Sequence, residues 1–252
     1  MFGTATTGTS HDIQSIPGLW RDAHGEAEAL SSRGMHHAAL RSAMLKDRKI
    51  VLMDRLGWDL QSPDGLHELD EYDDENTLYL IVHQPETGRH LGSVRLLPST
   101  GAHLLGDKFA HLCADGVPVG PDVWEITRLV TAPGLTRAEA LQVRRQLAIA
   151  LQEHALANRI QYYIMVTHLP WLPSLLSIGW DAEPLGLPHG EGVNAVAALR
   201  IHIDETTLQR LRAAWAIARP VPRIYSNRCS GTNHWCYNRC CRRLWCCQSI
   251  TK

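Results

Sequence analysis

The segment VWEITRLVTAPGLTRAE, residues 123–139, predicts a strand followed by a turn and a helix. Its first part, Val123–Thr131, is rich in β-branched and aromatic residues and predicts a strand. Pro133 and Gly134 break that strand. Thr136 and Glu139 then form a T-x-x-E capping box, which predicts the start of a helix. One face of this helix carries Val143, Leu147, Ala150 and His154.

The segments on either side of this strand–turn–helix unit predict a mixed α/β (α+β) domain. Each segment is assigned from its hydrophobic period, its turn residues or its cap. They are a helix over Met35–Met53, a hairpin of strands Leu78–His83 and His90–Leu97, a strand at Gln161–Thr167, a short helix at Pro170–Ile178, a strand at Val193–Ile203 and a helix capped by Asp204. This order predicts a sheet covered by helices.

Composition is that of a soluble protein with a sizeable core. The chain has 252 residues, of which 44% are hydrophobic and 20% charged, so wholesale disorder is excluded. No run of 18 apolar residues is present to span a membrane. The first residues, MFGTATTGTSHD, lack the basic and apolar parts of a secretion signal. We therefore expect a cytoplasmic protein with no membrane partner.

Charge and cysteine content divide the chain into a body and a tail. Residues 219–252 hold seven Lys or Arg and no Asp or Glu, and they contain six of the seven cysteines. The cysteine spacing fits no common zinc module, so we predict no metal site. The expected organisation is a flexible lead at 1–25, a folded domain at 26–218 and a basic, Cys-rich tail at 219–252 that is disordered or atypical.

The most specific signal is a set of charged and aromatic residues in a fixed order along about eighty positions. Its members are Arg48, Leu52, Trp58, Glu68, Asp70, Asp73, Arg95, Phe109, Glu125 and Arg128. In type, order and spacing this set resembles that of the LuxI-type acyl-homoserine lactone synthases, over roughly residues 35–218. Nine of the ten positions match the family pattern, and Leu52 stands where the family usually has Phe.

The resemblance implies a GNAT-like three-layer fold with a mixed, mostly antiparallel sheet flanked by helices. It also implies an acyltransferase. An acyl group arrives on acyl carrier protein or coenzyme A, and the amine of S-adenosylmethionine attacks the thioester. The substrate carboxylate then closes a lactone and expels methylthioadenosine. S-adenosylmethionine is thus a substrate, and no cofactor is expected.

The charged residues suit this chemistry, and they also suit a structural role. An acidic cluster would attract the sulfonium and ammonium groups of the substrate. Glu68 and Glu125 are the candidate bases that deprotonate the amine. Backbone N–H groups where the Glu125 strand separates from its neighbour would stabilise the oxyanion. The alternative is a buried ion-pair network with pairs such as Asp70–Arg95 and Glu68–Arg48.

The remaining candidates concern binding. Trp58 and Phe109 are either core residues or aromatic contacts for the sulfonium or adenine. By resemblance, Tyr163, Met165 and Leu172 line the acyl pocket, although plain core packing explains them equally well. Pro133 removes an N–H donor from the turn that cradles pyrophosphate in GNAT enzymes, which favours a carrier protein as donor. Candidates for docking an acidic carrier are Arg137, Arg144, Arg145 and Arg159, although an ordinary solvated helix face explains them equally well.

Two other functions fit parts of the sequence. A general GNAT N-acetyltransferase using acetyl-coenzyme A would share the fold but leave the acidic segment after Trp58 unexplained. A metal-binding or nucleic-acid-binding protein would act through the tail, yet the body resembles no nucleic-acid module, so we expect no nucleic-acid partner. Truncation after Ala218 separates this second alternative from an enzyme carried by the body.

Overall fold

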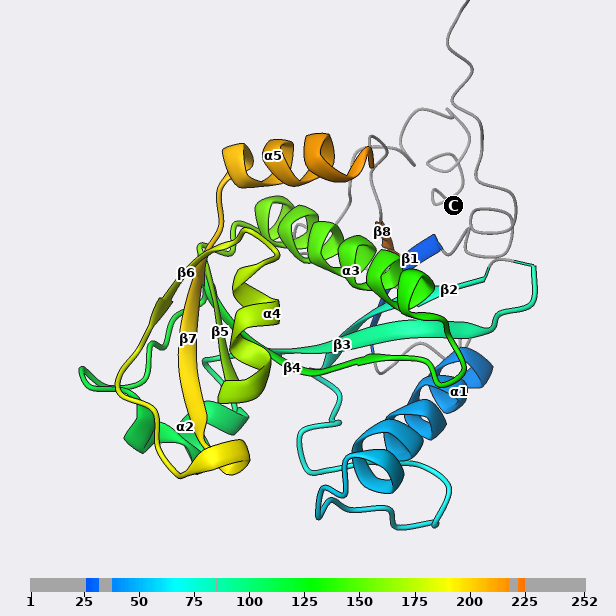
Figure 1. Cartoon of the computed structure of the whole chain (residues 1–252), viewed down its shortest axis with the longest axis horizontal. Helices are drawn as coiled ribbons and strands as arrows, with labels where there is room; N and C mark the ends of the chain where they lie inside the picture. The colour runs from blue at the N-terminus through cyan, green and yellow to red at the C-terminus, as the bar shows by residue number, and fades with distance from the viewer. Residues whose placement is uncertain (1–25, 32–37, 85, 218–221, 225–252) are drawn as a thin grey trace, which may run out of the picture.

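The computed structural model describes residues 26–31, 38–84, 86–217 and 222–224, and these form one eight-stranded sheet with helices on both faces (Figure 1). The strands follow the order β6-β7-β5-β4-β3-β2-β1-β8. They are β1 (Glu26–Ser31), β2 (Leu78–His83), β3 (His90–Pro98), β4 (Val123–Thr131), β5 (Tyr162–His168), β6 (Asp181–Pro184), β7 (Val196–His202) and β8 (Pro222–Ile224). Only the β4–β5 and β1–β8 pairs among these strands are parallel.

Helices cover the two faces unequally. The α-helices are α1 (Ala38–Arg48), α2 (Leu104–Lys108), α3 (Arg137–Asn158), α4 (Leu172–Leu176) and α5 (Glu205–Trp215). A π-helix, η2 (Lys49–Arg55), continues α1, and short 3-10 turns are η3 (Ala110–Leu112), η4 (Leu169–Trp171) and η5 (Gly192–Asn194). The capping box predicted at Thr136 and Glu139 is present at the start of α3. Among the described helices, none is long and apolar enough to cross a bilayer.

The core is divided by the sheet. The largest cluster packs α3 and α5 against one face, and its centre includes Leu80, Val94 and Leu147. A smaller cluster packs α1 against the other face through Met44, Tyr79 and others. Figure 1 shows α3 and α5 on one side of the sheet and α1 on the other. Strand β3 is buried at every position but its last, so it anchors both layers.

Strand β4 departs from regular pairing in two places. First, β4 pairs with β5 only over Val123–Glu125; beyond Glu125 the two strands separate. Second, the β3–β4 register shifts, so that Ser93 faces Val130 while Arg95 faces Thr127. Two β4 residues therefore oppose one β3 residue, which is a β-bulge. The predicted separation of the Glu125 strand from its neighbour is thus confirmed.

The fold predicted from the sequence is confirmed, with corrections at the element level. The helix expected over 35–53 is α1 followed by the π-helix. The last long strand starts at Val196, because Gly192–Asn194 forms a 3-10 turn. Strands β1 and β6 and helix α2 were not predicted; each is short and lacks a strong hydrophobic period. Strand β8 lies inside the predicted tail and pairs with β1. The lead at 1–25 and most of the tail lie outside the described residues.

Candidate functional site

Three arginines from three different elements meet three carboxylates from one loop. Arg48 ends α1, Arg95 lies in β3 and Arg128 lies in β4. The carboxylates Glu68, Asp70 and Asp73 come from the loop between the π-helix and β2. We call these six side chains the ion-pair network. It joins both predicted pairs, Asp70–Arg95 and Glu68–Arg48.

Arg48 holds two carboxylates at once. Its Nε donates to Glu68 Oε2 at 2.5 Å. Its two terminal nitrogens donate to Asp73 at 2.8 and 2.9 Å, in the bidentate geometry that guanidinium favours. Arg48 and Glu68 are 1% and 0% exposed, so both charges depend on each other for stabilisation.

Arg95 and Arg128 share Asp70. Arg95 Nη2 donates to Asp70 Oδ2 at 3.0 Å, and Arg128 Nη2 donates to the same oxygen at 2.7 Å. Arg128 Nε also reaches Glu68 Oε1 at 3.1 Å. Arg95 is oriented further by Thr127, whose hydroxyl accepts from its Nε at 2.9 Å. Thr127 lies between two predicted residues, but nothing in the sequence marks it as a partner of Arg95.

Arg128 has a strained backbone. Its φ is +53°, in the left-handed region that favours glycine. The residue sits at the β-bulge, where the extra β4 residue turns out of the ladder. An arginine in this position costs about 1–2 kcal/mol of backbone energy. The contacts of its guanidinium with Glu68 and Asp70 offset that cost, and the bulge directs the side chain toward them.

Asp73 is the most heavily bonded carboxylate of the network. Besides Arg48, it accepts from the Tyr79 hydroxyl at 2.6 Å and from the Asp70 backbone N–H at 3.0 Å. Burial alone would raise the pKa of Asp73, but Arg48, with help from Arg95 and Tyr79, holds it well below its usual range. Tyr79 is almost fully buried; the sequence places it in a core strand and gives no sign of this polar role.

The network is electrically neutral. Three guanidinium groups balance three carboxylates within hydrogen-bonding distance. Its carboxylates are therefore paired, while Glu71, Asp74 and Glu75 of the same acidic run lie outside the network. The attraction of a sulfonium by this run stays a prediction. The network fixes the loop to the sheet through Arg95 and Arg128.

The ion pairs should make stability dependent on acid. Because the folded pKa of Asp73 is depressed, its contribution is present above the unfolded pKa of about 3.9 and is lost as pH falls toward the folded value. We expect the free energy of unfolding to decline below about pH 4. Denaturant titrations of the wild type and Asp73→Asn between pH 3 and 7 measure this. The variant should be less stable at neutral pH and show a flatter acid dependence; parallel curves would contradict the assignment.

Glu125 stands apart from the network. Its Oε2 accepts the Leu104 N–H and its Oε1 accepts the Leu105 N–H, both at 2.7 Å. It therefore holds the first turn of α2, a helix that the sequence did not reveal. Burial raises the pKa of Glu125 above its ordinary value, although the two N–H groups act in the opposite direction. A buried carboxylate with a raised pKa is a better base than one paired with arginine.

Three further candidates are the aromatic residues Trp58 and Phe109 and the aliphatic residue Leu52. Trp58 is half-buried, and its ring centroid is 5.3 Å from that of His168, at the end of β5 where β4 and β5 have separated. Phe109 is half-buried and packs against the cluster of α2, β4 and β5 residues. Leu52 is buried in the π-helix, a helix type that is frequent at functional sites. Trp58 therefore lies beside the end of β5 that no longer pairs with β4.

The acyl-pocket candidates are packed on the α3 side of the sheet. Tyr163 and Met165 belong to the main core cluster, and Leu172 packs against it. The Tyr163 hydroxyl donates to the Leu151 carbonyl at 3.2 Å and lies 2.9 Å from His154 Nδ1. Burial lowers the pKa of His154 to about 4, so this imidazole is neutral at pH 7. The role of these residues as pocket walls stays a prediction.

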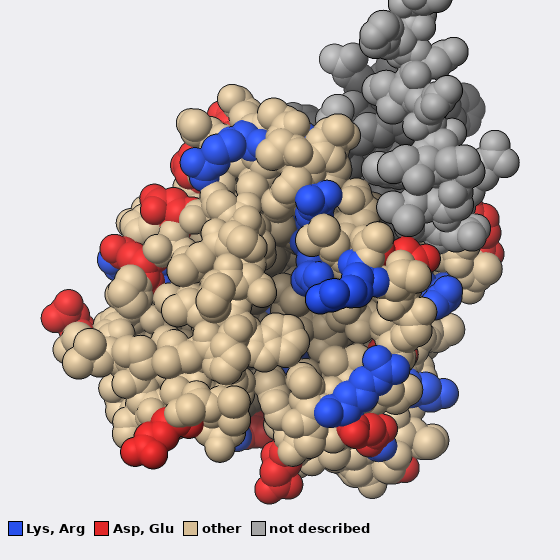
Figure 2. Space-filling model, viewed as in Figure 1, with Lys and Arg blue, Asp and Glu red and all other residues tan. Residues whose placement is uncertain are grey.

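The four docking candidates do not form one patch. Arg137 and Arg159 lie at opposite ends of α3, about 33 Å apart at 1.5 Å per residue. Arg145 already makes a cation–π contact within the fold, because its guanidinium lies 5.6 Å from the Trp215 ring centroid on α5. Arg137 and Arg144 are exposed on one face, two turns apart. Figure 2 shows Lys and Arg side chains in separate groups over the regions of α3 and α1.

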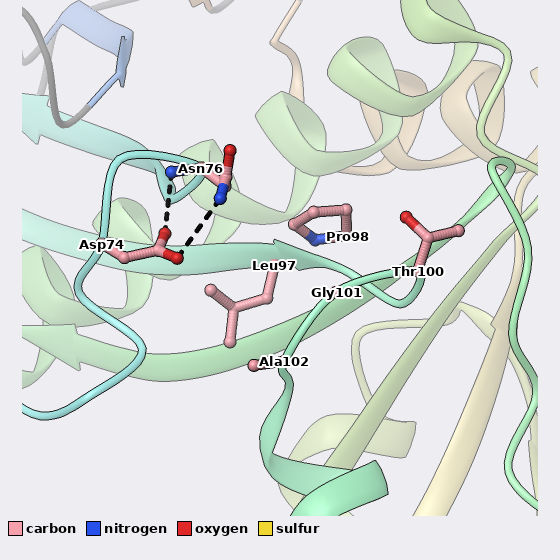
Figure 3. Close-up of a pocket in the computed structure, with 7 residues that line it drawn as sticks. All are labelled: Asp74, Asn76, Leu97, Pro98, Thr100, Gly101 and Ala102. Atoms are coloured by element: carbon pink, nitrogen blue, oxygen red, sulfur yellow. Dashed lines mark hydrogen bonds between the residues drawn. The ribbon is translucent and has the colours of Figure 1, made fainter.

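A cavity of about 240 Å³ lies beside the site. It is lined by Asp74, Asn76, Leu97, Pro98, Thr100, Gly101 and Ala102 (Figure 3). Leu97 pairs in register with Glu125, so the cavity adjoins the β3–β4 strand pair. Its lining includes no member of the ion-pair network. Among the described residues, no group of three or more His, Cys, Asp or Glu could hold a metal ion.

Comparisons with known proteins agree with this geometry. Residues 31–211 match the family model of the autoinducer synthases. An acyl-homoserine-lactone synthase of Ralstonia nicotianae is 33% identical over 192 residues, which cover 74% of this chain and 93% of that protein. An isovaleryl-homoserine lactone synthase of Bradyrhizobium diazoefficiens is 36% identical over 143 residues, covering 56% and 63%.

Solved structures give the same result. The coenzyme-A-dependent acyl-homoserine lactone synthase BjaI, bound to S-adenosylmethionine and isopentyl-coenzyme A, superposes with a TM-score of 0.73 at 28% identity, covering 81% of this chain and 95% of that one. TofI, in a ternary complex with an inhibitor and methylthioadenosine, superposes with a TM-score of 0.62 at 30% identity, covering 74% and 96%.

Proposed function

The chain belongs to the autoinducer synthase family, and from that membership we propose that it makes an N-acyl-homoserine lactone from S-adenosylmethionine and an acyl thioester. One observation carries the proposal. All three arginines and three of the four carboxylates of the family pattern, spread over eighty positions, meet in one buried network. This network fixes the loop between the π-helix and β2. Trp58, at the start of that loop, lies beside the point where β4 and β5 separate.

The acyl transfer uses groups around Glu125. The α-amine of S-adenosylmethionine must lose a proton, and a free α-amino group titrates near pH ~8. Glu125 is the better base of the two candidates, because Glu68 is shared by Arg48 and Arg128. The proton passes to Glu125 directly or through one water. The N–H groups of β4 beyond Glu125, which no longer face β5, stabilise the oxyanion. Its collapse forms the amide and breaks the thioester C–S bond, and the thiolate of the acyl donor leaves and takes up a proton.

Ring closure needs positioning more than acid–base help. The substrate carboxylate attacks its own γ carbon, and neutral methylthioadenosine leaves from the sulfonium. A good leaving group and a preorganised geometry suffice for this step, so we propose that the reaction needs no cofactor or metal. The ring of Trp58, which contacts His168, is suited to lie against the sulfonium or the adenine. A cytoplasmic location stays a prediction.

The acyl donor is proposed to be a carrier protein. In GNAT enzymes a helix start after the corresponding strand binds pyrophosphate. Here Glu139 occupies the start of α3, because its Oε2 accepts from both the backbone N–H and the hydroxyl of Thr136 at 2.7 Å. The hydrogen bonds of Thr136 hold the pKa of Glu139 below its ordinary value, so the carboxylate is ionised and repels a pyrophosphate. A carrier-bound phosphopantetheine brings only one phosphate.

This proposal predicts a change of donor preference in Glu139→Gln. Glutamine keeps the capping box but removes the charge. We expect the wild-type rate with an acyl carrier protein to be at least about tenfold higher than the rate with the matching acyl-coenzyme A. In the variant, the ratio of these two rates should be about threefold smaller. Steady-state rates of methylthioadenosine release with both donors measure it. A wild type that prefers coenzyme A would contradict the donor proposal but not the synthase activity.

A carrier would dock on the exposed face of α3 that holds Arg137, Leu141 and Arg144. These residues are spaced four and three apart, and Leu141 is 43% exposed between the two cations. An acidic, partly apolar helix would complement this face. Arg144→Glu should raise KM for the acylated carrier about tenfold at low salt, with KM for S-adenosylmethionine unchanged. Arg159→Glu, at the far end of α3, is the matched control and should change neither.

Identification of the product tests the function itself. Mass spectrometry of organic extracts from cells that express the chain should reveal an acyl-homoserine lactone and give its acyl length. The general N-acetyltransferase alternative predicts an acetylated amine and no lactone. A lactone in extracts from cells with the chain, absent from cells with an empty vector, supports the proposal; its absence from both would refute it.

A further inference from the structure

Outside the ion-pair network, three polar side chains form a relay between α1 and the loop that carries Glu68. Ser42 Oγ lies 2.9 Å from His67 Nε2, and His67 Nδ1 lies 2.5 Å from Asp64 Oδ2. Asp64 is itself fixed, because its Oδ1 accepts the backbone N–H groups of Leu66 and His67 at 2.9 and 2.8 Å. The carboxylate can only accept, so Nδ1 donates to Asp64. In the neutral imidazole, Nε2 then accepts a hydrogen bond from the Ser42 hydroxyl.

The order carboxylate, imidazole, hydroxyl is also that of serine hydrolases. A nucleophile at Ser42 would need nearby N–H donors for its oxyanion. Ser42 lies inside α1, where backbone N–H groups are used in the helix ladder. The N–H groups of α1 around Ser42 are therefore not available to an oxyanion. We assign the three side chains a role in holding the loop rather than in hydrolysis.

The relay is the first of three successive contacts along one face of α1. Ser42 contacts His67, the Leu45 carbonyl accepts the Glu68 N–H at 3.2 Å, and Arg48 binds the Glu68 carboxylate. Residues 42, 45 and 48 are spaced three apart and lie side by side on a helix. The loop is thus held against α1 by contacts at three successive positions, and Glu68 makes the last two of them, one through its backbone and one through its side chain.

We propose that His67 is a positioning residue for S-adenosylmethionine binding, which acts by holding the Glu68 loop against α1 through Ser42 and Asp64. This inference rests on the proposed function. The ion-pair network needs Glu68 within reach of both Arg48 and Arg128. Without the hydrogen bonds of His67, only the Leu45 contact and the ion pairs hold the loop near Glu68. The loop can then adopt several positions, of which the one that binds S-adenosylmethionine is only one.

Steady-state kinetics of methylthioadenosine release at saturating acyl donor test the proposal. His67→Ala should raise KM for S-adenosylmethionine about tenfold while kcat stays within about threefold. Ser42→Ala should have a smaller effect, and the double variant should be no worse than His67→Ala alone, since both break one relay. Leu66→Ala is the matched control, because this side chain is 61% exposed on the same loop; its KM should not change.

Asp64→Asn separates positioning from a charge relay. Asparagine keeps the acceptor for the two backbone N–H groups, and its amide can donate to Nδ1, so the opposite imidazole tautomer still bridges to Ser42. A wild-type KM in Asp64→Asn supports the proposal. An Asp64→Asn variant as impaired as His67→Ala, or an unchanged KM in His67→Ala, would overturn it.

Hydrogen exchange of the amides in residues 61–69 gives a second readout that does not depend on activity. Faster exchange there in His67→Ala than in Leu66→Ala supports the fastening of the loop, and equal exchange overturns it. If the wild type releases no methylthioadenosine, the proposed function fails, and the exchange measurement still decides whether the relay holds the loop.

Discussion

Arg128→Ala is expected to abolish lactone synthesis, with a loss of at least about 100-fold in kcat/KM. The substitution removes one partner from Glu68 and one from Asp70, both of which are buried. Removing one member of a buried ion pair costs about 3–5 kcal/mol, because the remaining charge is left without compensation. The network would carry a net negative charge, and the loop would move to hydrate it. Kinetics and denaturant unfolding of the purified variant measure both effects.

Arg128→Gly is the matched variant, since it removes the same guanidinium but accepts the positive φ without strain. We expect it to be as inactive as Arg128→Ala and about 1 kcal/mol more stable. A folded Arg128→Ala protein with near-normal activity would contradict the role assigned to the network. Equal stability of the two variants would contradict only the strain at the bulge.

Glu125→Gln is expected to lower kcat by about 100-fold or more while leaving the protein folded. Glutamine removes the base but keeps one oxygen for an N–H of α2. Glu125→Ala should be both inactive and less stable, because two buried N–H groups lose their acceptor at about 1–3 kcal/mol each. The comparison of the two variants therefore separates the chemical role of Glu125 from its structural role.

The pH dependence of kcat/KM gives an independent check on Glu125. A base must be ionised, so activity rises as pH increases through its pKa. Because burial raises the pKa of Glu125, the acid limb should lie above the ordinary range for glutamate. Thermal unfolding over the same pH range excludes loss of fold as the cause. A Glu125→Gln enzyme with substantial kcat and an unchanged acid limb would show that Glu125 only caps α2.

The sequence was most informative where strong local patterns coincide. The β-branched run at Val123–Thr131, the Pro133–Gly134 break and the capping box at Thr136 agree with one another, and the structure confirms the strand and the helix. The ordered charges also predicted two ion pairs correctly, because guanidinium and carboxylate groups in one buried set must pair.

Features that depend on three-dimensional packing were not predictable in this way. Helix α2 is five residues long and is stabilised by Glu125, which is about twenty residues away in sequence. The network is neutral because the bulge turns Arg128 toward the carboxylates. No local sequence pattern predicts a positive φ at an arginine. Tyr79 and Thr127 looked like ordinary strand residues, because a hydroxyl in a β-rich segment has no signature of its own.

The ratio of the two products shows whether these residues build a single site for S-adenosylmethionine and an acyl thioester. The purified chain is mixed with both substrates, and methylthioadenosine and acyl-homoserine lactone are quantified together over time. The predicted result is equal amounts of the two products, with neither formed when one substrate is omitted. An acylated product without methylthioadenosine, or no product with any carrier-bound or coenzyme-A-bound acyl group, would contradict it.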